Sequence, residues 1–353
     1  MSLATHYETV RDRHGYDRVD GIDVLAGLER RFVAVDGRET VAAALDRPTI
    51  VCMGAGTTGP PHLGTVGQIL TGIELQEAGL DVQFVIADLE PYHGGADWDR
   101  VRTLAERYRE FALGLGFDPD RGTLRTQSEA TEVMATGHRL ARYYAPDEWD
   151  DADETETAWS RAVRNLYERE STDEEKEGTE NRDGEGGGNG GPTSEAASAH
   201  SVVLHGADFL HPLAEEDYEQ VVVALGVDEH GLTPWTRQFL DATPVGGRVA
   251  GLHTRMVPGF DVPKMSKSID AGLSLDTPPK TVRERILDAT DRNEPRRSTV
   301  FQAMCLASRY DAETLDRLEA ACVEHGQDWQ QSRRVYAEYV AELAERWQRT
   351  DGD

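Results

Sequence analysis

The chain has 353 residues and carries 65 Asp and Glu against 37 Lys and Arg, which gives a formal net charge of −28. This length allows one large domain or two ordinary domains, each with its own core. So acidic a surface repels polyanions at long range and disfavours generic nucleic-acid binding, although a local basic patch still acts where salt screens the net field. The balance is typical of proteins that work in concentrated salt, and we expect a halophilic protein.

Cysteine usage and hydropathy favour a cytoplasmic protein. The three cysteines, Cys52, Cys305 and Cys322, form no CxxC pair and have no metal-ligand spacing, so no protein metal site is expected. An odd number of scattered thiols fits a reducing compartment. The N-terminal "MSLATHYETVRDRHG" has no apolar run and does not resemble a signal peptide. No stretch approaches about 18 consecutive apolar residues, so no membrane span or membrane partner is expected.

The first third of the chain alternates between helix-like and strand-like segments. Apolar residues at helical spacing predict an amphipathic helix over 21–48. Short apolar, β-rich runs predict buried strands at 48–54 and 80–90. Helices are predicted over 63–79 and over 97–117, the second beginning at an Asp cap and ending near a glycine. This alternation is typical of βαβ units in a parallel sheet with right-handed crossovers.

The middle of the chain breaks this pattern. Residues 168–200 combine many charges and a Gly cluster with almost no apolar content, so they cannot offset the entropy of ordering, and we expect a disordered insertion. A third buried strand is predicted at 221–231, followed by a helix across "TPWTRQFLDA". After residue 278 the sequence is largely helical in pattern.

The sequence therefore predicts an α/β protein with a Rossmann-like parallel sheet and a helical C-terminal region. In chain order we expect a helical N-terminal extension (1–47), the first half of the Rossmann-like domain (48–167), the disordered insertion (168–200), the second half of that domain (201–278) and the helical region (279–353).

The first strand runs into a glycine-rich turn, "GAGTTGPPHLG". Gly54 and Gly56 allow close backbone approach, and His62 stands directly before a helix start. Because a helix N-terminus presents unpaired N–H groups and a partial positive charge, a phosphate group can sit there and accept a hydrogen bond from His62. Taken alone, the stretch is more typical of an ordinary strand-to-helix connection with a surface histidine.

Two further segments carry candidate ligand-binding groups. The third strand ends in "GVDEHG", where Gly226 permits close ligand approach and Asp228 can accept hydrogen bonds from a ribose hydroxyl; the alternative is a simple polar turn. The stretch "DVPKMSKSID" (261–270) places Lys264 and Lys267 three residues apart. Positioned cations stabilise most where charge develops, as on a polyphosphate in a transition state. The alternative is a solvated loop.

Together these motifs resemble a known family. "KMSKS" (264–268) is identical to the second signature of class I aminoacyl-tRNA synthetases, and "PPHLG" stands where that class has its HIGH-type signature. "GVDEHGLTPWTRQFL" and "RTQSEA" are similar to segments of the tyrosyl and tryptophanyl subclass. The stretches that lead into "PPHLG" and that surround "KMSKS" resemble the archaeal tryptophanyl enzymes. The resemblance covers residues 28–325 apart from the insertion.

The resemblance implies an ATP-dependent enzyme that activates an amino acid and charges tRNA. It implies that His62, Thr65, Lys264 and Lys267 act on the α-phosphate of ATP, with Mg²⁺ bound to the pyrophosphate portion. The ATP-binding residues that it implies are Gly54, Gly56, Gly64, Gly226, Asp228, Met265, Ser266 and Ser268. Glu90 stands at the place of an acidic residue that holds the substrate ammonium group, and Asp88 is close by.

Four departures bear mainly on the amino-acid substrate. Thr65 replaces the second histidine of the HIGH signature, and Ala55 replaces an arginine of the family. Cys52 and Val85 fall where the archaeal tryptophanyl enzymes have a tyrosine and a glutamine near the indole N–H. Because hydrogen-bonding sites discriminate far more strongly than apolar pockets, losing these groups leaves the substrate open. The sequence favours tryptophan, with tyrosine second; the third alternative is a paralogue that binds ATP or an adenylate for regulation or modification without charging tRNA.

A tRNA partner requires basic contacts on this acidic molecule. The densest candidates are Arg292, Arg296 and Arg297 in "DRNEPRR", and Arg333 and Arg334 in "QSRR". The alternative for all five is a set of helix-face salt bridges to the plentiful glutamates. The resemblance further implies that the helical C-terminal region reads the anticodon and that the protein is a homodimer.

Overall fold

The structure is a computed structural model that describes residues 3–144, 195–257, 259, 273–289 and 294–350. The KMSKS motif and residues 168–194 of the predicted insertion lie outside the described residues.

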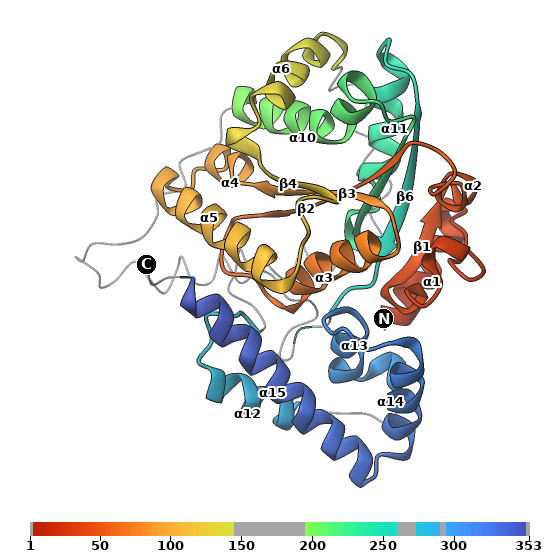
Figure 1. Ribbon diagram of the computed structural model, residues 1–353, viewed down its shortest axis with the longest axis vertical. Coiled ribbons are helices and arrows are strands. Elements are labelled where there is room, and N and C mark those ends of the chain that lie inside the picture. The colour runs from red at the N-terminus through yellow and green to blue at the C-terminus, as the bar shows by residue number, and fades with distance from the viewer. Residues whose placement is uncertain (1–2, 145–194, 258, 260–272, 290–293, 351–353) are drawn as a thin grey trace.

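A six-stranded sheet forms the centre of the molecule (Figure 1), in the order β1-β6-β5-β2-β3-β4. Strands β2 to β6 are mutually parallel, and β1 pairs antiparallel with β6 at the edge. The inner strands β2, β3 and β5 are near-continuous apolar runs, as expected for strands covered on both faces. The bounds are β1 (Phe32–Asp36), β2 (Thr49–Gly56), β3 (Asp81–Ala87), β4 (Gly122–Thr126), β5 (Gln220–Gly226) and β6 (Arg248–Thr254).

Helices cover both faces of the sheet. Ile50 and Cys52 of β2 pack on the side of α10 and α11, whereas Val51 and Met53 pack on the side of α3 and α5, so the strand alternates between two cores. The bounds of these and the neighbouring helices are α3 (Leu63–Glu77), α4 (Leu89–His93), α5 (Trp98–Leu115), α6 (Thr131–Leu140), α10 (Glu195–Glu215) and α11 (Leu232–Ala242). The sheet, its parallel strands and the covering helices confirm the predicted fold class.

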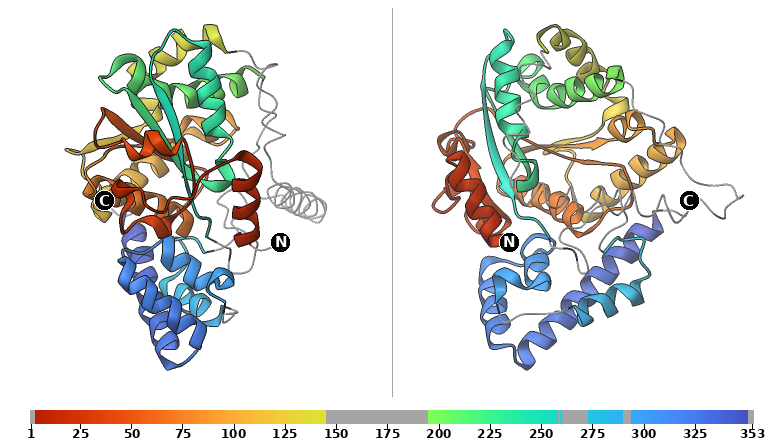
Figure 2. Two further views of the ribbon diagram at one scale, coloured as in Figure 1. Left: turned by 90° about the vertical axis from the view of Figure 1, so that its right-hand side faces the viewer. Right: turned by 180° about the vertical axis from the view of Figure 1, so that it is seen from behind.

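The C-terminal region is helical, as predicted, and it forms a separate lobe below the sheet (Figure 2). Its helices are α12 (Pro279–Asp288), α13 (Thr299–Leu306), α14 (Ala312–Glu324) and α15 (Gln327–Arg349). Trp329, Tyr336 and Trp347 of α15 are fully buried and belong to the same hydrophobic core as α3 and α5. Arg31 joins the two parts, because its guanidinium contacts Glu74 of α3 and the carbonyl oxygens of Leu306 and Ser308.

The helix predicted over 21–48 is wrong. Instead the structure has short 3₁₀ turns, the edge strand β1 and the short helix α2 (Arg38–Ala42), preceded by α1 (Leu3–His14). Gly27 and Gly37 have φ of 84° and 83°, which interrupts any helix, and β1 then adds to the sheet beside β6. The N-terminal extension is therefore only partly helical. Residues 195–200, which were predicted to be disordered, belong to the helix α10.

Candidate functional site

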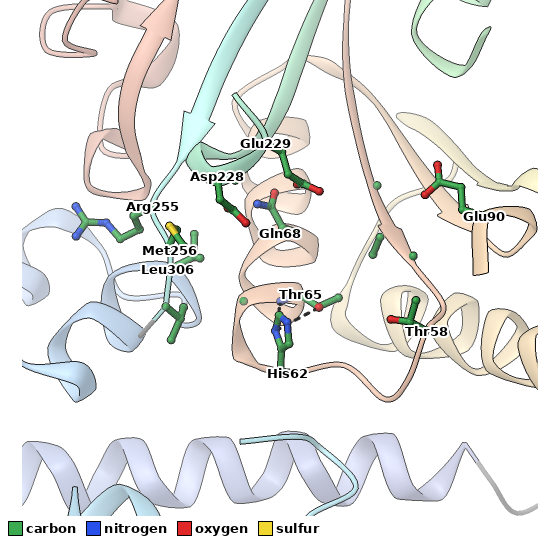
Figure 3. A pocket seen from close by; sticks show the side chains of 16 residues that line it. Thr58, His62, Thr65, Gln68, Glu90, Asp228, Glu229, Arg255, Met256 and Leu306 are labelled. Atoms are coloured by element: carbon green, nitrogen blue, oxygen red, sulfur yellow. Dashed lines mark hydrogen bonds between the residues drawn. The ribbon is translucent and has the colours of Figure 1, made fainter. Parts of the chain in front are cut away.

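A cavity of about 350 Å³ lies at the carboxyl edge of the sheet (Figure 3). It is bounded by the ends of β2 and β5, the segment after β6, and the start of α3, which is where open α/β sheets bind ligands. Eight of the residues predicted from the sequence line it: Gly54, Gly56, His62, Gly64, Thr65, Glu90, Gly226 and Asp228. Gln68, Glu229 and Arg255 line it as well and were not predicted.

His62 occupies the N-cap position of α3. Its Nδ1 accepts a hydrogen bond from the Thr65 main-chain N–H at 3.2 Å and lies 3.4 Å from Thr65 Oγ1. A neutral imidazole whose Nδ1 accepts carries its proton on Nε2, so His62 is set as a donor through Nε2. Gly64 must be small for a local reason, because a Cβ there would lie 2.9 Å from Cε1 of His62.

The end of β5 presents acidic groups to the same cavity. Figure 3 shows Asp228 and Glu229 gathered beside Gln68, above His62 and Thr65. A Cβ on Gly226 would clash with Oδ1 of Asp228, so this glycine is required for the observed position of the carboxylate. Gln68 is held by its hydrogen bond to Thr254 Oγ1 at 2.6 Å.

Both ends of the segment that contains KMSKS lie at this cavity. Val257, just before the segment, lines it. Ser274, just after the segment, forms an antiparallel bridge with His62, and the Leu275 N–H donates to the Pro61 carbonyl oxygen at 2.9 Å. Lys264, Met265, Ser266, Lys267 and Ser268 lie outside the described residues.

A second cavity, of about 80 Å³, adjoins the first. The two cavities share Glu90, Glu229 and the main chain of 54–56 as lining. The inner wall of the small cavity comes from β3, α10 and β5, and its residues are Val85, Ala87, His205, Asp208, Phe209 and Leu225. A ligand in the first cavity can therefore extend a short side chain into the second.

Glu90 and His205 form an ion pair between the two cavities, with Nδ1 of His205 at 3.0 Å from Oε1 of Glu90. Burial acts to raise the pKa of Glu90, but the hydrogen bond and charge of His205 leave that pKa below its ordinary value. Burial acts to lower the pKa of His205, and the contact with Glu90 raises it overall. Glu90 is therefore ionised at neutral pH, as an ammonium-binding carboxylate requires.

Asp208 is a further functional candidate that sequence reasoning missed. It is only 3% exposed, and burial raises the pKa of its carboxyl to about 7, although a hydrogen bond from Gln127 acts against this. Its Oδ2 accepts from Gln127 Nε2 at 2.7 Å, while Oδ1 is buried with no hydrogen-bond partner among the described residues. The available signal was a carboxylate within the otherwise apolar helical run "VVLHGADFLHPL".

Cys52, which the resemblance aligns with a tyrosine of the archaeal tryptophanyl enzymes, is not among the residues that line this cavity. Its thiol is buried, and burial raises its pKa, so it stays protonated. Gln83 Nε2 contacts Cys52 Sγ at 3.7 Å and donates to the main-chain oxygen of Asp208 at 2.8 Å. Gln83 thus ties β3 to α10 at the position where Asp208 faces the cavity.

Two predicted ligand residues have structural roles instead. Asp88 is fully buried and accepts from the Ser128 main-chain N–H at 2.9 Å and from the Ser128 hydroxyl, so it holds the "QSE" segment against α4 and lines neither cavity. Arg333 is 4% exposed and donates to the carbonyl oxygens of Ile286, Leu287 and Ala289, so it caps α12 and is not available to tRNA.

The remaining predicted tRNA contacts lie in different parts of the structure. Arg296 and Arg297 are exposed beside α13, where they lie 3.8 Å from Glu8 and 3.4 Å from Glu294. Arg334 is exposed on α15. Arg292 lies outside the described residues.

None of the described helices is long and apolar enough to cross a membrane.

Known proteins resemble this chain in sequence and in fold. The family model for "tRNA synthetases class I (W and Y)" matches residues 44–145. Tryptophan--tRNA ligase 1 of Halobacterium salinarum is 37% identical over 129 residues, which is 35% of this chain and 25% of that protein. Tryptophan--tRNA ligase of Methanopyrus kandleri is 27% identical over 327 residues, 86% of this chain and 77% of that protein. The tryptophanyl-tRNA synthetase of Aeropyrum pernix K1 superposes with a TM-score of 0.69 at 19% identity, covering 98% and 94% of the two chains.

The parallel sheet, the cavity at its carboxyl edge and the helical C-terminal lobe define the class I synthetase fold. Within that class, the sequence is similar to the tryptophanyl and tyrosyl subclass of aminoacyl-tRNA synthetases.

Proposed function

We propose that this protein activates an amino acid with MgATP to form an aminoacyl-adenylate and then charges tRNA. The observation that carries the proposal is the 350 Å³ cavity, which brings together the His62 turn, Asp228 and both ends of the segment that contains KMSKS. The adjoining small cavity, entered past Glu90, provides a place for the amino-acid side chain.

In the first step the substrate carboxylate attacks the α-phosphorus, the bond to the β-phosphate oxygen breaks, and magnesium pyrophosphate leaves. His62 donates to a phosphate oxygen through Nε2, the tautomer that its Nδ1 contact with Thr65 supports. Thr65, Lys264 and Lys267 stabilise the charge that develops on the pentavalent phosphorus. In the second step a hydroxyl of the 3′-terminal nucleotide of tRNA attacks the carbonyl carbon, and AMP leaves.

ATP binding follows from the same arrangement. Asp228 accepts from a ribose hydroxyl, and the adenine packs against the start of α3 at Gly64. The phosphates lie along the turn, where the glycines permit close approach and the N-terminus of α3 favours negative charge. Gly54, Gly56 and Gly226 permit that approach. Met265, Ser266 and Ser268 are the other residues proposed to bind ATP.

The proposal places the substrate ammonium group at Glu90 and names tryptophan as the substrate. The relatives with a tryptophan specificity in their names support this choice. Because Cys52 and Val85 offer no acceptor for an indole N–H, that role passes to Asp208, whose Oδ1 is buried at the small cavity.

Tyrosine is the second candidate, and Asp208 favours it as well. A buried carboxylate is a strong acceptor for a phenol hydroxyl, and a site built around such an acceptor rejects side chains without a donor. The small cavity measures about 80 Å³, whereas an engineered cavity of about 150 Å³ holds benzene. Any aromatic substrate therefore has to widen this cavity. The small volume is also consistent with the third candidate, a paralogue that binds ATP without charging tRNA.

ATP–pyrophosphate exchange with each of the twenty amino acids, measured in molar KCl, tests the proposal. Exchange with tryptophan alone supports the first candidate, and exchange with tyrosine alone supports the second. ATP binding without exchange for any amino acid contradicts activation and favours the non-charging paralogue. A homodimer in the cytoplasm, working at high salt, completes the proposal; light scattering of the purified chain tests the dimer.

A further inference from the structure

Another cavity, of about 540 Å³, lies between the N-terminal segment and the C-terminal helices. One wall comes from α1, the loop 18–21 and β1, and the other from the 3₁₀ turn Pro295–Arg297, α13 and the start of α14. Figure 1 shows the start of the chain beside α13. The cavity has the size of a site for a nucleotide or a short segment of a larger ligand.

Arginines gather at this cavity in a protein of net charge −28. The five that line it are Arg11, Arg18, Arg30, Arg255 and Arg296. Arg30 is paired with Asp316 and Glu319, and Arg296 lies 3.8 Å from Glu8. Within the part of the chain that the structure describes, no ion pair is found for Arg11, Arg18 or Arg255. We call this set of residues the arginine cavity.

Two of these arginines repel each other. Arg11 is anchored by a hydrogen bond to the Val33 carbonyl oxygen at 3.1 Å. Burial lowers the pKa of Arg11, and the positive charge of Arg18 lowers it further, whereas the carboxylates of Glu8, Asp12 and Asp20 act in the opposite direction. An anion between the two guanidinium groups would relieve this repulsion. Four carboxylates, those of Glu8, Asp20, Glu29 and Asp316, also line the cavity, so a ligand with separated phosphates fits better than a single compact anion.

The arginine cavity shares a wall with the 350 Å³ cavity to which ATP binding is proposed, here called the ATP cavity. Arg255 lines both cavities and is held by Gln302 Oε1 at 2.7 Å and by the Arg30 carbonyl oxygen. The next residue, Met256, lines the ATP cavity, and its main-chain N–H and C=O both contact the Tyr7 hydroxyl, at 2.9 and 3.3 Å. Tyr7 itself lines the arginine cavity. A polynucleotide whose end reaches the 350 Å³ cavity can therefore pass along Tyr7 and Arg255, which line the arginine cavity.

We infer that the arginine cavity binds phosphodiester groups of an RNA strand, those that precede the 3′ end of the tRNA acceptor arm. This inference rests on the proposed function, because that function requires a 3′ end in the ATP cavity. Guanidinium groups without carboxylate partners are suited to phosphate oxygens, to which they donate two parallel hydrogen bonds. Their position beside the ATP cavity matches a strand whose terminal hydroxyl reacts there.

The test uses the full chain and a fluorescent RNA hairpin that ends in a single-stranded CCA. Arg18→Gln removes an exposed charge, whereas Arg121→Gln makes the same change on the turn before β4, away from the cavity. We expect Arg18→Gln to weaken hairpin binding about tenfold and to reduce the slope of log affinity against log salt by about one. Arg18→Lys keeps the charge and should retain most of the affinity. Equal hairpin affinity and equal salt slope for Arg18→Gln and Arg121→Gln would overturn the inference.

A second arm separates RNA from free phosphate compounds, with tripolyphosphate as the probe. If Arg18→Gln lost tripolyphosphate binding while hairpin binding stayed unchanged, the cavity would hold a small polyphosphate and the RNA assignment would be wrong. ATP–pyrophosphate exchange needs no RNA, so we expect it to be unchanged in Arg18→Gln. Failure of exchange in the wild type would contradict the proposed function, whereas failure of the hairpin comparison contradicts only this inference.

Discussion

The main-chain N–H of Leu275 donates to the carbonyl oxygen of Pro61 at 2.9 Å, and the residue before it, Ser274, bridges to His62. The chain that leaves KMSKS is therefore fixed on the turn that holds His62. Lys267 precedes Ser274 by seven residues in the sequence.

The first prediction concerns Lys267. Lys267→Ala should lower the rate of amino-acid activation by about two to four powers of ten, because it removes a cation positioned where charge develops. ATP binding should change little, since that charge is stronger in the transition state than in the ground state. Pre-steady-state adenylate formation measures the rate, and equilibrium dialysis measures ATP affinity.

The composition supplies a matched control for Lys267. Only four of the 37 basic residues are lysines, at positions 176, 264, 267 and 280. The side chain of Lys280 is 86% exposed and lies 3.7 Å from Glu284. Lys280→Ala should therefore leave activation unchanged. Equal rates for the two alanine variants would contradict the role of Lys267.

The second prediction concerns Gly64. In Gly64→Ala the new Cβ would lie 2.9 Å from Cε1 and 3.0 Å from Nδ1 of His62, so the imidazole has to move. We expect the rate of adenylate formation to fall about a hundredfold, which is typical of a misplacement of about 1 Å. Gly114→Ala, in α5 with no heavy atom within 4 Å of its Cβ, is the control and should keep full activity. Full activity in Gly64→Ala would show that the position of His62 is not critical.

The parallel strands and their helices could be predicted because each signal was local. β2, β3 and β5 are apolar runs, and α5 begins at the predicted cap, where Asp97 accepts from the Arg100 N–H at 2.9 Å. The strand β6 was missed because "RVAGLHT" contains a glycine and a histidine and is a strand only through its pairing with β5. β1 was missed because helical spacing in 21–48 hid the two glycines of positive φ.

The meeting of the candidate residues after β2 and β5 was predictable for a similar reason. The carboxyl ends of parallel strands meet at one edge, so the turns after β2 and β5 had to come together. Arg255 and Asp208 could not be found this way. Arg255 reaches the cavity only because β6 lies beside β5, and Asp208 faces the small cavity only because α10 packs on β2 and β5. Those placements depend on tertiary contacts.

The third prediction concerns Asp208 as an acceptor for the substrate side chain. Because burial raises its pKa to about 7, Asp208 is a carboxylate above pH 7 and a neutral acid below it. The KM for the activated amino acid should therefore fall as pH rises through 7 in the wild type. In Asp208→Asn it should be independent of pH and about tenfold higher at pH 8. The exposed Asp241→Asn on α11 is the control. A KM with the same pH profile in both variants would remove Asp208 from substrate recognition.

The same group affects stability with a defined sign. The folded-state pKa of Asp208 lies above the ordinary value of 3.8, so the folded state binds the extra proton between about pH 4 and 7. This contribution is fully present below pH 4 and is lost as pH rises through 7, at about 1.4 kcal/mol per unit of pKa difference. Urea denaturation should therefore show the wild type gaining stability relative to Asp208→Asn on going from pH 8 to pH 5. A constant difference between the two would contradict the raised pKa.

The last prediction separates two adjacent arginines of α15. Arg333 donates to three carbonyl oxygens at the end of α12, at 2.8, 2.7 and 2.9 Å, whereas Arg334 is exposed and lies 3.5 Å from Gln331 Oε1. Arg333→Met keeps the side-chain volume but leaves these carbonyl groups without their donor and the helix end without its cation. It should lower the free energy of unfolding by about 3 kcal/mol.

Arg334→Met is the matched control for the effect of Arg333→Met on the free energy of unfolding. The same variant also tests whether Arg334 contacts tRNA. Its free energy of unfolding should stay within about 0.5 kcal/mol of the wild type, as for other surface changes. If Arg334 contacts tRNA, the same variant raises the KM for tRNA in aminoacylation without changing ATP–pyrophosphate exchange. Urea denaturation and aminoacylation kinetics on both variants decide the matter. Normal stability in Arg333→Met, combined with weaker tRNA binding, would restore Arg333 as a tRNA contact, because the charge would then act on the ligand and not on the end of α12.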